Sequence, residues 1–120
     1  LSLNTFAFTA VKAVYTGGAP WLDELLVYLK KNMAYVVEEL NAMEGIQVVV
    51  PDATYLMWID YRGTGLSEQE IMQRLLTTGQ VALDPGTKYG EAGNGFLRMN
   101  VACPFDTLKE GVERFKRALK

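Results

Sequence analysis

Histidine is absent from the 120 residues of this chain, and cysteine occurs once, at Cys103. Without histidine the chain has no Ser-His or Cys-His nucleophile pair, no histidine metal site and no side chain that ordinarily titrates near neutral pH. A single cysteine excludes an internal disulfide, and its apolar surroundings favour a buried thiol over a nucleophile. We expect neither metal chemistry nor histidine-based catalysis.

A strong charge of one sign and a long hydrophobic run are also missing. The formal net charge is −2, and no cluster of lysine or arginine could neutralise a phosphate backbone. The longest apolar runs, such as YLMWI, fall far short of the roughly 20 residues that cross a bilayer, and no signal-peptide pattern opens the chain. We therefore expect a cytoplasmic protein with no nucleic-acid or membrane partner.

Hydrophobic periodicity predicts eight elements in the order α-α-β-β-α-β-β-α. The predicted helices are residues 4–15, about 20–43, 65–79 and 106–119, and the predicted strands are residues 46–50, 54–61, 81–84 and 96–101. The length fits one domain with a single core. The fold class expected is α+β, with helices covering a small, mostly antiparallel sheet.

Local signals mark several of these boundaries. The glycines in TGG, residues 16–18, are expected to end the first helix. Ser67 and Glu70 have the spacing of a capping box at the start of the third helix, and Gly79 is expected to end that helix. Asp106 is placed to cap the last helix.

The helices differ in how their apolar residues are arranged. The second and last helices each carry an apolar stripe that predicts packing on a core. The stripe of the second helix consists of Leu22, Leu25, Leu26, Leu29, Met33, Val36, Val37 and Leu40, and that of the last helix of Leu108, Val112, Phe115 and Leu119. The first helix, FAFTAVKAVY, is apolar over much of its surface. Such a helix is expected to pack against something beyond a 120-residue core, such as a partner domain.

Arg98 lies within the apolar strand NGFLRMNV and is the main candidate binding residue. Strand alternation places it on one face with Phe96 and Asn100, while Leu97, Met99 and Val101 point into the core. An exposed arginine on the solvent side of a sheet is the simpler interpretation. The functional interpretation is anion capture, because a guanidinium presents two parallel donors that match a carboxylate.

The loop PGTKYGEAGNG, residues 85–95, precedes this strand and contains Gly86, Lys88 and Tyr89. Its glycine spacing is neither G-x-G-x-x-G nor that of a P-loop, and it leads into a strand, which argues against nucleotide binding. A loop of this length is either a mobile connection or part of a site. The aromatic residues Tyr55, Trp58 and Tyr61 are expected in the core rather than at a ligand.

Four separated segments, GGAPWLDELLVYL, TYLMWIDY, VALDPGTKYG and GFLRMNVACP, resemble the C-terminal small domain of class I/II, fold type I, pyridoxal-phosphate enzymes. The resemblance extends over nearly the whole chain and is nearest to the cystathionine beta-lyase branch. It implies that Arg98 binds the α-carboxylate of an amino-acid substrate and that Gly86, Lys88 and Tyr89 belong to a loop at the mouth of the active site.

The resemblance also implies what the chain does not contain. The lysine that forms the Schiff base with pyridoxal 5'-phosphate, and most contacts to that cofactor, lie in the family's large domain upstream, so no catalytic residue is assigned here. Residues 1–120 are then expected to be a fragment, one small domain that is inactive alone. Its partners would be its own large domain and, in the intact enzyme, a second subunit of a homodimer.

Three alternatives remain open at this point. The intact enzyme could be an aminotransferase, because lyases and aminotransferases of this family share the small domain. Outside enzymes, the chain could be a freestanding module that binds amino acids through Arg98, or an interaction domain that docks a partner on its apolar first helix.

Overall fold

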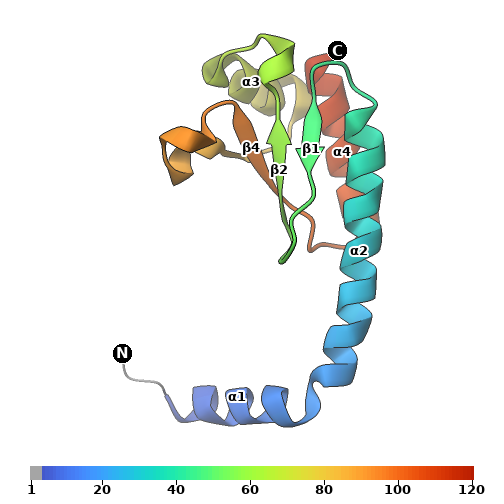
Figure 1. Cartoon of the computed structure of the whole chain (residues 1–120), viewed down its shortest axis with the longest axis vertical. Helices are drawn as coiled ribbons and strands as arrows, with labels where there is room; N and C mark the ends of the chain where they lie inside the picture. The colour runs from blue at the N-terminus through green and yellow to red at the C-terminus, as the bar shows by residue number, and fades with distance from the viewer. Residues whose placement is uncertain (1–3) are drawn as a thin grey trace.

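The computed structural model of the chain describes residues 4–120 and shows a small sheet covered by helices on one face (Figure 1). Four strands form it: β1 (Gln47–Val49), β2 (Leu56–Asp60), β3 (Asp84–Pro85) and β4 (Phe96–Asn100). Their order is β1-β2-β4-β3, and every neighbouring pair is antiparallel. The predicted α+β class and the antiparallel sheet are confirmed.

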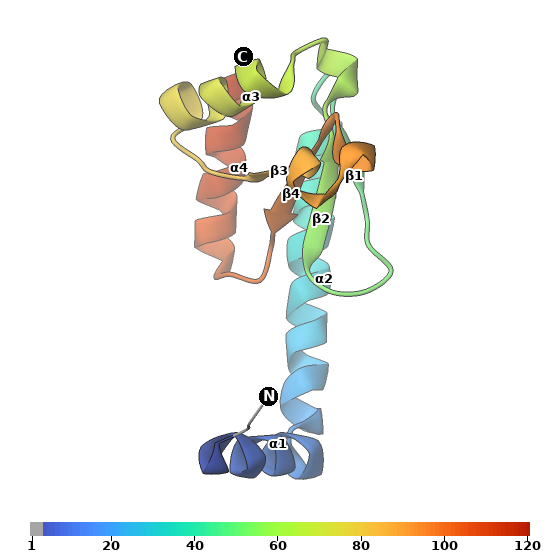
Figure 2. The ribbon, with the colours of Figure 1, turned by 90° about the vertical axis from the view of Figure 1, so that its left-hand side faces the viewer.

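The core lies between this sheet and helices α2 (Ala19–Asn41), α3 (Glu68–Arg74) and α4 (Phe105–Leu119). Strands β2 and β4 contribute alternate residues to it, so that Met57 and Ile59 are buried opposite Leu97 and Met99. The long helices α2 and α4 run side by side against the sheet (Figures 1 and 2). Val36 and Leu40 of the predicted α2 stripe are fully buried, whereas Leu22 and Leu26 nearer its start are exposed.

One buried polar side chain joins α2 to the end of β4. Asn32 is 1% exposed, and its Nδ2 donates hydrogen bonds to the carbonyl oxygens of Val101 at 2.8 Å and Cys103 at 3.1 Å. These bonds satisfy backbone groups just after the strand stops pairing. Asn32 therefore fixes how the sheet is held against α2.

Helix α1 (Thr5–Gly17) stands away from this body and lies across the start of α2 (Figure 1). None of its residues is buried, and Phe6 and Tyr15 are 86% and 88% exposed. The prediction that this apolar helix finds no cover within the core is confirmed for the part of the chain that the structure describes. The two helices meet at Gly18, whose φ of −84° is ordinary helical backbone, so no left-handed glycine makes the break.

The remaining boundaries follow local signals in most places. The capping box of α3 is present, with Ser67 accepting from the backbone of Glu70 and the Glu70 carboxylate accepting from the backbone of Ser67. A single π-helical turn, η2 (Leu75–Gly79), extends α3 to the predicted Gly79. Short 3-10 turns are η1 (Arg62–Thr64), η3 (Gly86–Tyr89) and η4 (Glu91–Gly93).

Two sequence expectations were wrong. Asp106 does not cap α4, because Pro104 occupies the cap position and Asp106 lies inside the first turn, where its charge still complements the helix dipole. The strand predicted at 81–84 pairs only at Asp84 and Pro85.

Among residues 4–120 no helix combines the length and apolar character of a membrane span.

Candidate functional site

The outer face of the sheet, opposite the helices, carries one row of side chains that crosses all four strands. In register, Val49 of β1 faces Trp58 of β2, Trp58 faces Arg98 of β4, and Arg98 faces Asp84 of β3. Arg98 thus points away from the core, on the face predicted from strand alternation. Its side chain is 27% exposed, so the guanidinium is accessible from outside the domain.

Asp84 is the centre of a polar cluster on this face. Its Oδ2 accepts hydrogen bonds from an Arg98 Nη atom at 2.6 Å and from the Tyr89 hydroxyl at 3.0 Å, and its Oδ1 accepts from Lys88 Nζ at 2.7 Å. One carboxylate therefore holds the strand arginine together with two residues of the loop predicted to border the site. The structure brings Arg98, Lys88 and Tyr89 into a single cluster.

The cluster keeps its carboxylate ionised. Hydrogen bonds from Lys88, Tyr89 and Arg98 lower the pKa of Asp84 to about 2. The hydrogen bond to Asp84 in turn raises the pKa of Lys88 above its ordinary value. At neutral pH the cluster therefore contains two cations and one anion.

Aromatic rings border the guanidinium. The Arg98 Cζ atom lies 4.4 Å from the centre of the Tyr89 ring, which itself packs edge to face on Trp58 with 5.8 Å between ring centres. The expectation that Trp58 is a core residue was therefore wrong, since it lies on the outer face. The same expectation fails for Tyr55, which is 41% exposed, and is confirmed for Tyr61, which is 2% exposed.

Beside Tyr89 there is an apolar hollow of about 330 Å³ on the outer face. It is lined by Val49, Trp58, Tyr89, Ala92, Gly93 and Phe96. The hollow and Arg98 share the Tyr89 ring as a common wall.

The loop is held in shape by close contacts within the chain. A Cβ atom on Gly86 would lie 2.1 Å from the carbonyl oxygen of Gly93, so only glycine fits where the two turns meet. Thr87 Oγ1 donates to the carboxylate of Glu68 at 2.8 Å, which ties η3 to the start of α3. The side chains of Lys88 and Tyr89 are thereby presented to Asp84 from a fixed backbone.

This arrangement can hold a carboxylate. A guanidinium has five N–H donors, and among the described residues Arg98 uses one Nη to reach Asp84. An edge of the guanidinium is left for a second carboxylate, which would approach from the open side of the sheet.

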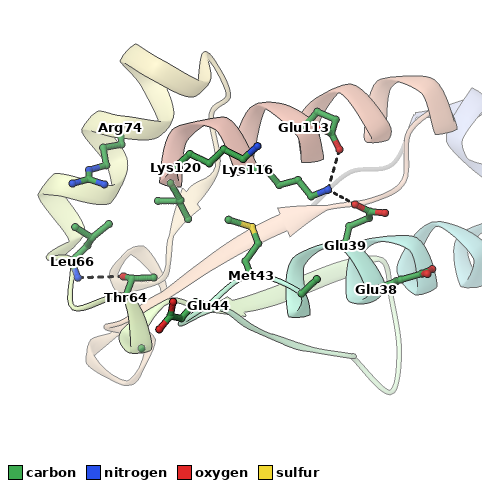
Figure 3. A pocket seen from close by; sticks show the side chains of 13 residues that line it. Glu38, Glu39, Met43, Glu44, Thr64, Leu66, Arg74, Glu113, Lys116 and Lys120 are labelled. Carbon is green, nitrogen blue, oxygen red and sulfur yellow. Dashed lines mark hydrogen bonds and ion pairs between the residues drawn. The ribbon is translucent and has the colours of Figure 1, made fainter.

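A larger pocket of about 920 Å³ lies on the helical side of the domain, away from Arg98 (Figure 3). At its centre Lys116 Nζ donates to the carboxylates of Glu39 and of Glu113, the latter at 3.1 Å. The hydrogen bond to Glu39 raises the pKa of Lys116. The amine is engaged and protonated, and the charged lining residues are four acids against three cations, so the pocket has no positive surplus for an anionic ligand.

The described residues do not form a site for pyridoxal phosphate. Such a site needs a lysine amine inside a pocket that also supplies donors to a phosphate. The amines of Lys88 and Lys116 are both held by carboxylates, and Lys120, which also lines the larger pocket, is exposed like the other described lysines. No group of three or more potential metal ligands occurs within residues 4–120 either.

Sequence reasoning missed Asp84 as a site residue. The sequence places Asp84 only at the end of a predicted strand, because its partner Arg98 is 14 residues away and their contact depends on strand pairing. The motif DPGTKY contains a usable signal for the contact of Asp84 with Lys88. Its acid lies four residues before its lysine at the start of a turn, a spacing that allows the two side chains to pair. Alternation with the charged Asp60 could also have placed Trp58 on the outer face.

Comparison with known proteins identifies relatives over almost the whole chain. Residues 2–115 match the family described as Aminotransferase class I and II. The chain is 48% identical over 121 residues to cystathionine beta-lyase PatB of Bacillus subtilis, covering 98% of this chain and 30% of that protein. It is 38% identical over 120 residues to protein MalY of Escherichia coli, covering 99% and 31%.

A solved structure gives the same result for the fold. Cystalysin from Treponema denticola, whose crystal structure contains a pyridoxal 5'-phosphate cofactor, superposes with a TM-score of 0.92 at 28% identity. The superposition covers 99% of this chain and 30% of cystalysin. The chain therefore spans about 30% of the length of these relatives.

Proposed function

Because this chain belongs to the aminotransferase class I and II family, we propose that it is the C-terminal domain of a pyridoxal-phosphate-dependent carbon-sulfur β-lyase. The observation that carries the proposal is the 48% identity to a cystathionine beta-lyase over 98% of the chain. In the full-length protein the reaction would convert an S-substituted cysteine and water into a thiol, pyruvate and ammonia.

The cofactor belongs, in this proposal, to the part of the enzyme outside the 120 residues. Pyridoxal phosphate is present in the structure of the related cystalysin, and the described residues of this chain offer no pocket for it. The chain alone is then expected to show no cofactor absorbance and no lyase activity. The cytoplasmic location and the homodimeric assembly of the intact enzyme stay predictions.

Arg98 is the residue proposed to bind the substrate α-carboxylate. The support is geometric: it lies on the open face of the sheet, its side chain is 27% exposed, and its remaining donors point to no partner among the described residues. Pairing with a substrate carboxylate would orient the amino acid for reaction at its α-carbon. The loop residues Gly86, Lys88 and Tyr89 would border this position.

The experiment uses the full-length protein loaded with its cofactor, and measures pyruvate release from cystathionine. Arg98→Ala is expected to lower kcat/KM by an amount equivalent to about 2–5 kcal/mol of transition-state stabilisation, because a charge-assisted carboxylate contact is lost. Arg98→Lys keeps the positive charge but loses the two parallel donors of the guanidinium, so its kcat/KM is expected to lie between those of the wild type and Arg98→Ala. Arg62→Ala is the control, since Arg62 lies in the turn η1 just after β2 and pairs with Asp60 in a comparable bond.

Two results would contradict this proposal. Equal kcat/KM for Arg98→Ala and the wild-type enzyme would remove Arg98 from substrate binding. Absence of pyruvate release without an added keto acid, together with activity when one is supplied, would favour the second candidate, an aminotransferase. The family match includes aminotransferases by its description, so both reactions belong in the assay.

A further inference from the structure

The Asp84 cluster carries a definite charge. Lys88 and Arg98 each donate to a different oxygen of the Asp84 carboxylate, at 2.7 Å and 2.6 Å. Tyr89 contributes a neutral hydroxyl to the same carboxylate. Two positive charges face one negative charge, so one positive charge is left in excess.

We propose that Asp84 sets the charge selectivity of the carboxylate site, by leaving it with the positive charge that one substrate carboxylate requires. The substrates favoured would be amino acids whose side chain carries no net negative charge near this end of the molecule. Amino acids with a second carboxylate near Lys88 would be disfavoured, because Asp84 already occupies that amine. The inference rests on the proposed role of Arg98.

Among residues 4–120, the cation next to the cluster, Arg62 over the Phe96 ring, is already paired. Arg62, in the turn η1 just after β2, is held by Asp60, whose two oxygens both accept from its guanidinium. Glu68 takes the hydroxyl of Thr87, and Glu91 in η4 adds a further acid. Of the described cations, Lys88 is then the one that could meet a second substrate carboxylate: its side chain is 58% exposed, but its amine is engaged by Asp84.

Replacing Asp84 by asparagine should change the charge selectivity of the carboxylate site. The amide has nearly the same shape and can still accept a hydrogen bond from Arg98, but the negative charge is gone. A dianion carries twice the charge of a monoanion into the same site, so it gains more from the change. At separations near 6 Å in a partly exposed site, we expect the dianion to gain about tenfold in affinity relative to the monoanion.

The test measures binding rather than turnover, by calorimetric titration of the full-length, cofactor-loaded protein. The probes are glutarate, a dianion, and butyrate, a monoanion of similar length. In Asp84→Asn the preference for glutarate over butyrate should rise about tenfold. The control is Asp60→Asn, which removes an acid from the same sheet that does not contact Lys88 or Arg98, and its preference should stay at the wild-type value.

A second pair of variants checks the charge argument independently. Lys88→Met leaves Arg98 fully compensated by Asp84, so butyrate affinity should fall by about tenfold. Combining Asp84→Asn with Lys88→Met restores one excess positive charge, and butyrate affinity and the glutarate preference should both return toward wild type. A merely structural role of Asp84 would not produce this recovery, because the double variant would bind more weakly than either single variant.

The outcomes separate this inference from the proposed function. An unchanged glutarate preference in Asp84→Asn, or an equal rise in Asp60→Asn, would overturn the role of Asp84. Failure of the proposed carboxylate site would show differently, as butyrate binding that survives Arg98→Ala. Lyase activity does not enter either measurement, so a different reaction would leave the test of Asp84 intact.

Discussion

Replacing Asn32 by leucine should loosen the attachment of the sheet to helix α2. Leucine has a similar volume, so the change removes the polar contacts without opening a large cavity. The two hydrogen bonds to the carbonyl oxygens of Val101 and Cys103 are lost, and Val101 is fully buried. A buried carbonyl without its donor costs about 1–3 kcal/mol.

The second carbonyl adds less to this loss. The carbonyl oxygen of Cys103 also accepts a long hydrogen bond from the Tyr28 hydroxyl, at 3.5 Å, and keeps that contact in the variant. We therefore expect Asn32→Leu to lower the free energy of unfolding by about 2–4 kcal/mol. Asn32→Asp should lower it further, because carboxylate oxygens would then face the two carbonyl oxygens in a buried site.

The assay is urea unfolding at neutral pH, followed by far-ultraviolet circular dichroism. The midpoint should fall in the order wild type, Asn32→Leu, Asn32→Asp, with little change in the slope. Lys31→Leu is the control, since it places the same residue at an exposed position of the same helix and should change the free energy by less than about 0.5 kcal/mol. Equal midpoints for Asn32→Leu and Lys31→Leu would refute the reasoning.

Two further predictions concern the loop and the Asp84 cluster. Gly86→Ala should lower the thermal unfolding midpoint, because its Cβ would lie 2.1 Å from the Gly93 carbonyl oxygen. Gly111→Ala is the matched variant on helix α4, where a Cβ would meet nothing within 4 Å. It should raise the free energy of unfolding by about 0.5–1 kcal/mol. The opposite order would contradict the packing argument. The pKa of Asp84 is lowered to about 2, chiefly by the hydrogen bond from Lys88. The ionised carboxylate therefore stabilises the folded state above its ordinary pKa of 3.8, and this contribution is lost as pH falls toward 2. The stability difference between wild type and Asp84→Asn, from urea unfolding at several pH values, should be constant near neutrality and shrink below pH 4; a difference that grows on acidification would exclude this account.

Elements whose signals are local could be predicted closely from the sequence. The capping box at Ser67 and Glu70 is formed within four residues, so it depends on no distant partner. The spacing of Val112 and Phe115 likewise predicts the buried side of α4, where both are fully buried. Asp106 fails as a cap because Pro104 ends the preceding extended segment two residues earlier, and the helix starts directly after it.

The site was predictable only as far as strand alternation reaches. Alternation places Arg98 on the outer face, and that prediction is confirmed. Its partner Asp84 depends on the pairing of β3 with β4, in a strand of two residues that carries almost no periodic signal. The burial preference of tryptophan predicts a core position for Trp58, whereas the alternation of β2 places it on the outer face.

Helix α1 and the outer face of the sheet lead to the same conclusion about what the domain needs. A helix of 13 residues is marginal in water by itself, and α1 gains nothing from packing on the core, since none of its residues is buried. The outer face places a partly buried ion pair and an apolar hollow next to each other without a cover from residues 4–120. Each feature is costly in an isolated domain, and each becomes favourable if another part of the protein packs on it. Both are therefore accounted for by the proposal that the 120 residues are the smaller part of an enzyme whose remaining chain closes the site around Arg98.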